Sequence, residues 1–239
     1  MKQNKPIELY YWPTPNGWKV SIMLEECNIP YILKPVNIGQ GDQFKPKFLK
    51  ISPNNRMPAI IDPYGPGGKS ISIFESGAIL QYLGRKSGKF YPKNERSRVK
   101  VDEWIYWQMC GLGPMAGQAH HFRQYAPMKI KYAIKRYTDE VNRLYGVMDR
   151  QLKNNEYLAG RYSIADIACW GWVIPWKNQG QKLSDFSNLK RWFEQVGKRS
   201  AVIKGFAAGK EMRKQLLSEN TKEAKRAKSI LFNQRARKI

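Results

Sequence analysis

The sequence predicts two structural halves, an α/β half of about 90 residues followed by an all-helical half. Strand-type and helix-type patterns alternate up to about residue 90, where the turn-rich stretch Ser87–Asn94 follows. Beyond it, helical periodicity dominates and strand patterns fade. We therefore expect domains at residues 1–90 and 91–218, with a basic C-terminal tail at 219–239.

The first half is expected to fold in the order β-α-β-α-β-β-α, because β-type runs alternate with helical spacing. A Gly/Pro-rich turn at Pro63–Lys69 separates the last two strands, and Ser76 precedes the last helix as a candidate N-cap. The expected strands are Ile7–Tyr11, Tyr31–Val36, Ala59–Asp62 and Ser70–Phe74, and the expected helices cover about residues 18–27, 46–51 and 77–83.

The second half is expected to be helical throughout, with one strongly marked helix start at Ser163–Asp166. Serine followed three residues later by an acidic residue is a capping box, with Tyr162 and Ile167 spaced as its hydrophobic staple. We interpret this motif as structural, and expect Asp166→Ala to cost about 1 kcal/mol of stability. The expected helices cover about residues 96–110, 129–153, 163–174, 188–199 and 200–217.

Composition indicates a globular intracellular chain. Of the 239 residues, 42% are hydrophobic, which is enough for a core. No run approaches the roughly 18 apolar residues of a membrane span, and the first residues lack the apolar segment of a secretory signal. The three cysteines, Cys27, Cys110 and Cys169, are widely spaced in apolar helical patterns and form no CxxC motif, so we expect free thiols and a cytoplasmic location.

The net charge of +23 admits two interpretations. Strong basicity is typical of nucleic-acid binding, and it is also found in proteins whose lysines simply form a solvated surface. Residues 1–94 carry 13 basic and 6 acidic side chains and residues 95–239 carry 29 and 13, so both halves are positive. With no helix-turn-helix, zinc-finger or RNP pattern, we favour the solvated surface over nucleic-acid binding.

The first candidate for chemistry is the predicted strand-turn-helix junction at Thr14–Gly17. A helix N-terminus offers free N–H groups and the positive end of the helix dipole. The hydroxyl of Thr14 and the amide of Asn16 could donate there to a thiolate and keep it ionised. The structural alternative is an ordinary Thr/Asn cap on a Pro-Gly turn.

Two further motifs lie at strand ends. Met57-Pro58 precedes a strand. The sequence alone leaves open whether the bond between them is cis. If it is cis, the main chain of Met57 could pair with an extended peptide. Glu75 and Ser76 follow another strand at a helix start, where the carboxylate could bind an ammonium group and the hydroxyl and free N–H groups a carboxylate. Together they fit the head group of an amino acid.

The order of these motifs resembles the cytosolic glutathione S-transferase superfamily, and specifically its bacterial nu class of glutathione-dependent disulfide-bond oxidoreductases. The resemblance extends over about residues 7–215. It rests on Thr14–Gly17, Gly41–Phe44, Ile51–Asn55, Phe74–Leu80, Gly111–Met115, His120–Phe122, Tyr132–Tyr137 and Tyr162–Trp170.

The resemblance implies a thioredoxin-like domain without redox cysteines, a helical domain and a homodimer. It also implies glutathione, reduced or as disulfide, as co-substrate. Its sulfur would lie beside Thr14 and Asn16, which carry the catalysis. The implied binding residues are Gln43 at the glycyl end, the main chain of Met57, Glu75 and Ser76 at the γ-glutamyl group, and Arg136 at a carboxylate of a second glutathione or of the disulfide.

The expected function is disulfide reduction by a bound glutathione thiolate, and no protein cysteine is expected at the reacting centre. Conjugation of glutathione to electrophiles and a non-enzymatic binding or regulatory role are the alternatives. His120 and His121 are too differently oriented to share a metal, so we expect one to line the second-substrate pocket and the other to pack. The tail is either a surface helix or disordered; its basic face is solvated or docks an acidic partner or nucleic acid.

Overall fold

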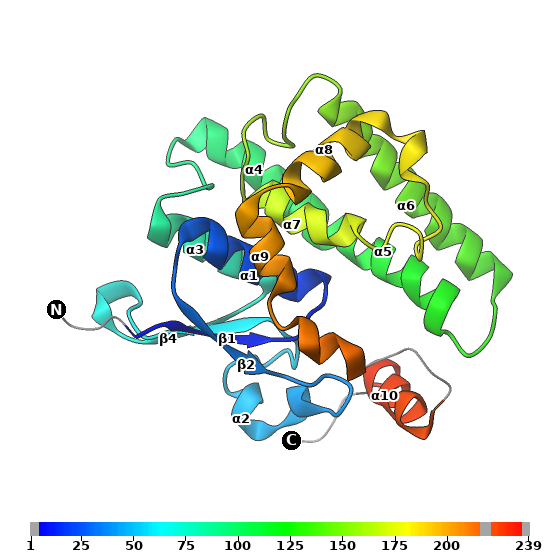
Figure 1. The fold of residues 1–239 in the computed structure, drawn as a ribbon, viewed down its shortest axis with the longest axis horizontal. Helices are drawn as coiled ribbons and strands as arrows, with labels where there is room; N and C mark the ends of the chain where they lie inside the picture. The colour runs from blue at the N-terminus through cyan, green and yellow to red at the C-terminus, as the bar shows by residue number, and fades with distance from the viewer. Residues whose placement is uncertain (1–4, 216–220, 236–239) are drawn as a thin grey trace.

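The computed structural model describes residues 5–215 and 221–235, and these form a four-stranded sheet domain beside a helical bundle (Figure 1). The strands are β1 (Ile7–Tyr11), β2 (Tyr31–Pro35), β3 (Ala59–Asp62) and β4 (Ile71–Phe74). The helices of the first domain are α1 (Pro15–Cys27), α2 (Pro46–Leu49) and α3 (Ser76–Ser87). Those that follow are α4 (Glu95–Trp107), α5 (Gly113–His120), α6 (Lys131–Leu152), α7 (Ile164–Val173), α8 (Ser187–Gly197), α9 (Ser200–Ala207) and α10 (Lys222–Phe232).

The sheet is mixed and has the strand order β2-β1-β3-β4. β1 and β2 are parallel, with Ile7 opposite Tyr31, whereas β3 is antiparallel to both β1 and β4. Ile60 of β3 is fully buried and pairs with Leu9 on one side and Ile73 on the other. The order β-α-β-α-β-β-α predicted from the sequence, and the thioredoxin-like class that the resemblance implied, are confirmed.

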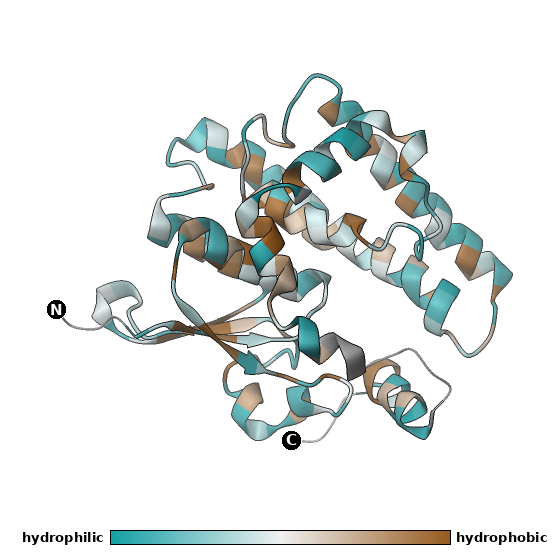
Figure 2. Ribbon diagram, in the orientation of Figure 1, coloured by the Kyte–Doolittle hydropathy of each residue, from teal (hydrophilic) through white to brown (hydrophobic). Residues whose placement is uncertain are grey.

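The two domains share one hydrophobic core. α1 packs against α3 of its own domain and against α7 and α9 of the helical domain. α7 is buried over nearly its whole length, and Figure 2 shows apolar residues concentrated where the sheet domain meets the bundle. Because α1 begins directly after β1, the start of this helix lies at the boundary between the domains, where a site can draw side chains from both.

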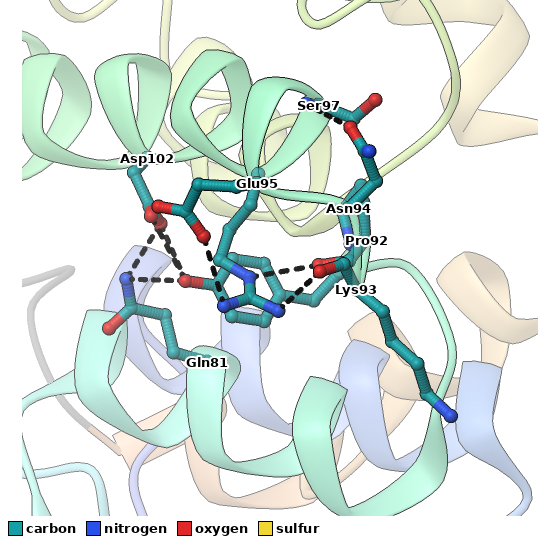
Figure 3. Close-up of polar contacts among 9 residues, drawn as sticks. Gln81, Pro92, Lys93, Asn94, Glu95, Ser97 and Asp102 are labelled. Carbon is teal, nitrogen blue, oxygen red and sulfur yellow. Dashed lines mark hydrogen bonds and ion pairs between the residues drawn. The ribbon is translucent and has the colours of Figure 1, made fainter.

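The linker between the domains is held by side-chain hydrogen bonds (Figure 3). Asp102 of α4 accepts from Gln81 of α3 at 2.8 Å and from the Tyr91 hydroxyl at 2.9 Å. Arg98 donates to the carbonyls of Pro92 and Lys93 at 3.0 and 2.8 Å. These bonds connect α3, the linker and α4, and so help to fix the relative position of the two domains.

Several elements differ from the prediction. The sequence analysis did not predict α5. This helix is flanked by π-helical turns at η3 (Gln108–Leu112) and η4 (His121–Tyr125), which break the 3.6-residue periodicity of an α-helix. The expected helix 200–217 ends early as α9, and residues 216–217 lie outside the described part. The prediction that Ser76 is an N-cap is wrong. The cap is Glu75, and Ser76 is the first residue of α3.

The C-terminal tail contains a helix, α10, that packs on the rest of the molecule. Its N-cap is Thr221, whose hydroxyl accepts from the N–H of Ala224 at 3.1 Å. Phe232 contacts the rings of His121 and Tyr125, and Gln234 accepts from Arg56 at 2.6 Å. The surface-helix alternative is therefore correct for residues 222–232, whereas residues 219–220 and 236–239 lie outside the described residues. The proposed domain boundaries stay predictions.

No helix within the described ranges is long and apolar enough to cross a membrane.

Candidate functional site

A polar cavity of about 390 Å³ lies where the two domains meet. The sheet domain contributes the start of α1, the loop before β3 and the β4–α3 junction, and the helical domain contributes η3, α5 and α7. Four of the predicted site residues line it: Asn16, Met57, Glu75 and Ser76. The fold thus brings together three motifs that are up to 60 residues apart in the sequence.

Asn16 is held in one orientation by Trp172 of α7. The indole Nε1 of Trp172 lies 3.0 Å from Asn16 Oδ1. An indole N–H only donates, so the amide oxygen must face Trp172, leaving the Nδ2 group of Asn16 as a donor toward the cavity that both residues line. The helical domain therefore sets a donor at the N-terminus of α1, the arrangement that stabilises a thiolate.

Thr14 is both an N-cap and a neighbour of this site. Its hydroxyl accepts from the N–H of Gly17 at 3.3 Å, so the structural interpretation as a cap is correct. The same hydroxyl lies 3.9 Å from the sulfur of Met57, which lines the polar cavity, while Thr14 itself lines a second cavity described below. Thr14 thus stands between two cavities.

Met57 and Glu75 present main-chain and charged groups to the polar cavity. The Met57-Pro58 bond is cis, and neither main-chain group of Met57 has a partner among the residues described. Glu75 is exposed, receives a hydrogen bond from Asn54 at 3.2 Å, and has a φ of 67°, a conformation that costs a non-glycine residue roughly 1–3 kcal/mol. Such strain is common at functional sites and directs this carboxylate to the cavity wall.

Ser76 adjoins a buried residue that the sequence analysis missed, Lys19 of α1. Its Nζ atom lies 2.6 Å from Gln108 Oε1, 3.3 Å from Ser76 Oγ and 3.4 Å from Met109 Sδ. Burial lowers the pKa of Lys19 to about 7, partly offset by the negative charges of Cys169 and Glu75 when these are ionised. A lysine in an amphipathic helix normally faces solvent, so no sequence signal pointed to it.

Two predicted binding residues lie away from the polar cavity. Gln43 is 2% exposed and donates to the carbonyl of Ile38 at 3.1 Å, without lining the cavity. The side chain of Arg136 on α6 is 56% exposed, and its closest acidic neighbour is Glu140 at 3.8 Å. The structure does not bring either residue to Asn16 and Glu75, and their roles stay predictions.

A second cavity, of about 420 Å³, lies on the other side of the Thr14 turn and is mainly apolar. Trp12, Trp18 and Ile174 form its walls, and Leu231 of α10 contributes to it from the C-terminal tail. His120 lines this cavity and burial lowers its pKa, whereas His121 packs against Phe232 with ring centroids 4.6 Å apart. One histidine therefore lines a cavity and the other packs, as expected, whereas the expectation that this cavity takes the second substrate stays a prediction.

None of the three cysteines lines either cavity. Cys27 and Cys169 are buried, and burial raises the pKa of both thiols. The expectation that all three belong to apolar helical patterns is wrong for Cys110, which lies on the π-helical turn η3 and is exposed. Among the residues described, no cluster of three or more His, Cys, Asp or Glu side chains could hold a metal ion.

Two protein-family models match the chain. The model of the glutathione S-transferase N-terminal domain matches residues 5–85, and that of the C-terminal domain matches residues 115–199. The two matches include most of the elements that line the two cavities. The exceptions are η3 and the first two residues of α5, which lie between the matches, and α10, which lies beyond them.

Curated proteins of the same family are also similar to the chain. The chain is 50% identical to the disulfide-bond oxidoreductase YfcG of Escherichia coli over 199 residues, 82% of this chain and 92% of that protein. It is 39% identical to the E. coli disulfide-bond oxidoreductase YghU, over 84% of this chain and 74% of that protein.

Among solved structures, a Pseudomonas fluorescens glutathione transferase family member with two glutathione molecules bound superimposes with a TM-score of 0.81 at 41% identity. That match covers 86% of this chain and 94% of that one. A Pseudomonas putida glutathione transferase with one glutathione disulfide per subunit gives a TM-score of 0.83 at 40% identity, covering 87% and 94%. Both domains, in their order and at these identities, place the chain in the glutathione S-transferase family, among its members of the bacterial disulfide-bond oxidoreductase type.

Proposed function

We propose that the polar cavity binds glutathione and that Asn16 and Thr14 stabilise its thiolate for attack on a disulfide. The enzyme is a glutathione transferase with disulfide reductase activity, and glutathione is its co-substrate. The observation that carries the site assignment is the convergence of Asn16, Met57, Glu75 and Ser76 on one cavity. Gln43 and Arg136 are proposed to bind the glycyl end and a second glutathione, on the resemblance alone.

The cavity offers a complementary group for each part of the tripeptide. The Glu75 carboxylate fits the γ-glutamyl ammonium group, and the Ser76 hydroxyl with the N-terminus of α3 fits its carboxylate. The main-chain groups of Met57, which have no partner among the described residues, fit the cysteinyl backbone. This arrangement leaves the sulfur near the donor Nδ2 of Asn16, at the positive end of α1.

The chemistry then needs no protein thiol. The bound glutathione thiolate attacks one sulfur of a disulfide, forming a mixed disulfide and releasing one thiolate, which takes up a proton. The thiolate of a second glutathione attacks the glutathione sulfur of the mixed disulfide, releasing the other thiol and leaving glutathione disulfide. Two glutathiones are oxidised for each disulfide reduced, and the protein supplies orientation and electrostatic stabilisation.

Turnover of 2-hydroxyethyl disulfide with glutathione tests the assignment. Asn16→Ala removes a donor to the developing or bound sulfur anion, and we expect kcat to fall by roughly 100-fold. Cys110→Ser is the matched control, since the exposed thiol of η3 should be dispensable. Unchanged turnover in Asn16→Ala contradicts its role, and loss of turnover in Cys110→Ser contradicts the glutathione-only mechanism.

The apolar cavity favours conjugation of glutathione to electrophiles as a second activity of the same site. Its lining by Trp12, Trp18 and Leu231 suits an apolar substituent close to the Thr14 turn. A chloronitrobenzene assay measures this activity directly. If glutathione binds without turnover in both assays, the non-enzymatic alternative stands instead.

A cytoplasmic homodimer completes the proposal. Free thiols suit a reducing compartment, and large apolar side chains of β4 and α4 are exposed on the single chain, namely Phe74, Val99 and Tyr106. Light scattering should therefore give twice the 27.8 kDa mass of the chain. A mass of one chain contradicts the dimer without affecting the site assignment.

A further inference from the structure

Lys19 is a basic side chain that the fold buries, and it has no acidic partner among the described residues. It is 1% exposed, and its hydrogen-bond partners are the neutral groups of Gln108, Ser76 and Met109. Buried ammonium groups are normally paired with a carboxylate, because an isolated charge is costly in a low-dielectric interior. Within the part of the chain that the structure describes, no acidic side chain forms an ion pair with Lys19.

Gln108 provides a second, independent sign of a missing acceptor at the same place. Its side chain is 1% exposed and lines the polar cavity. Its Oε1 accepts from Lys19, whereas its Nε2 is buried without a hydrogen-bond partner among the described residues. A buried amide N–H without an acceptor is unfavourable and uncommon. The floor of the cavity thus carries donors, from two domains, that lack an anionic acceptor.

We infer that Lys19 is a positioning residue for the γ-glutamyl carboxylate of glutathione, acting through Ser76, and that this carboxylate draws a proton onto Lys19 when it binds. The inference rests on the proposed function of the cavity. It adds a residue from inside α1 that lies behind the subsite and couples ligand binding to protonation.

The positioning follows from the direction of hydrogen bonds. A charged ammonium can only donate, so Lys19 Nζ donates to Ser76 Oγ and the hydroxyl proton of Ser76 must point elsewhere. Its acceptor in this structure is the sulfur of Met109 at 3.7 Å, a weak acceptor that a carboxylate can replace. A neutral amine would instead be able to accept the proton of Ser76, which removes the donor from the subsite.

The proton uptake follows from the charges that face Lys19. Glu75 at the start of α3 and Cys169 of α7 act to raise its pKa, burial outweighs them, and Arg56 lines the same cavity as a further cation. The resulting pKa of about 7 means that the amine is largely neutral at pH 8 in the free protein. A carboxylate that binds beside Ser76 favours the ammonium form, so the proton comes from the buffer and affinity decreases as the pH rises through 7.

Calorimetry of the full chain with S-methylglutathione tests this inference. The ligand keeps the γ-glutamyl group but has no thiol, so it cannot release a proton from sulfur. Phosphate and Tris differ in ionisation enthalpy. At pH 7.5 the binding enthalpies measured in the two buffers should therefore differ, by an amount that corresponds to the uptake of a fraction of a proton. Between pH 6 and 8 the Kd of the wild-type protein should increase by up to about tenfold.

Three variants sharpen the test. Lys19→Met should weaken binding at pH 6 by roughly 10- to 100-fold and abolish both the proton uptake and the pH dependence. Gln108→Glu places a carboxylate beside the ammonium, so that Lys19 is already charged and uptake disappears. Lys190→Met, on the exposed face of α8 and outside both cavities, removes the same charge and should behave like the wild type.

The outcomes separate the inference from the proposed function. Wild-type binding with a buffer-independent enthalpy and a flat pH profile overturns the inference and leaves the proposed function standing. Lys19→Met with wild-type affinity and proton uptake does the same. A wild-type chain that does not bind S-methylglutathione overturns both.

Discussion

The two cavities beside the Thr14 turn differ in how many residues around them have a strained backbone or a buried polar group without its usual partner. The polar cavity contains Glu75, a residue at positive φ. It also contains two buried side chains, Lys19 and Gln108; among the described residues, Lys19 has no carboxylate partner and the amide N–H of Gln108 has no acceptor. The apolar cavity is lined mainly by aromatic and aliphatic side chains, and none of its lining residues is at positive φ. Local costs of this kind persist where binding needs them, so the difference supports the proposal that the polar cavity binds glutathione.

The two cavities also differ in how many of their lining residues lie within the ranges that the family models match. Most of the polar cavity is built from elements within residues 5–85 and 115–199, whereas Leu231 in the apolar cavity belongs to α10, outside both matches. Changes in the polar cavity should therefore affect every reaction of the enzyme. Changes at α10 should affect only the choice of the second substrate.

The largest expected effect is on stability. Replacing Lys19 by methionine should increase the free energy of unfolding at pH 7 by up to about 5 kcal/mol, because a pKa lowered from 10.5 to about 7 means that burial disfavours the charged form. Since the unfolded chain binds more protons between pH 7 and 10, the wild-type protein gains stability there and the advantage of the variant shrinks. Urea unfolding of both proteins at pH 7, 8 and 9 measures the difference. A stability difference between the two proteins that stays the same from pH 7 to pH 9 would show that the buried amine carries no such cost.

The second largest effect should appear at Glu75. Glu75→Gln removes the charge that faces the ligand ammonium, and we expect the KM for glutathione to rise roughly 10- to 100-fold. Stability should change by less than about 0.5 kcal/mol, since Glu75 is exposed and its described partner is Asn54.

Glu75→Gly is the matched companion. It should lose the same affinity while gaining about 1 kcal/mol, because glycine adopts a positive φ without strain. Steady-state kinetics and thermal unfolding of both variants check this pair, and an unchanged KM in both would remove Glu75 from the subsite.

A smaller effect is expected at Trp172. Trp172→Phe keeps an aromatic wall but removes the indole donor that fixes Asn16, so the amide can rotate. We expect kcat for disulfide reduction to fall about tenfold, with little change in the KM for glutathione. Trp176→Phe, outside the polar cavity, is the control that should retain kcat. Equal rates for both variants would show that Asn16 needs no orientation by α7.

The smallest effect belongs to the apolar cavity. Leu231→Ala should change the KM for an aromatic electrophile by about three- to fivefold, from the loss of apolar contact, while the KM for glutathione stays the same. Lys225→Ala, exposed on the same helix, should change neither. If Leu231→Ala alters glutathione binding equally, the two cavities are not separate in function.

Much of the fold follows from local patterns in the chain. The strands Ile7–Tyr11 and Ala59–Asp62 were predicted to the residue, because turn residues bound these short apolar runs. The capping box at Ser163 is confirmed, with its N–H donating to Asp166 at 3.0 Å. α5 was not predicted, because two glycines and a proline lie at its start and the π-helical turns on both sides shift the 3.6-residue register.

The stability cost predicted for Asp166→Ala from the capping box alone is too small. Asp166 was expected to contribute about 1 kcal/mol as a capping residue. In the fold it also accepts from the indole of Trp192 at 2.8 Å and from the N–H of Leu158 at 3.0 Å, and burial raises its pKa to about 6. Asp166→Ala should therefore destabilise the protein by more than the isolated cap suggests, about 3 kcal/mol.

The sequence by itself determined the class of fold and the order of the motifs, because these depend on short-range spacing, and the resemblance of those motifs to a family implied a glutathione site. Only the tertiary structure decided that Trp172 orients Asn16, that Lys19 lies buried behind Ser76, and that α10 contributes to the second cavity. These contacts join residues separated by 156 positions in the first case and 57 in the second. No local pattern encodes such pairs, since they exist only once both domains have packed along α1.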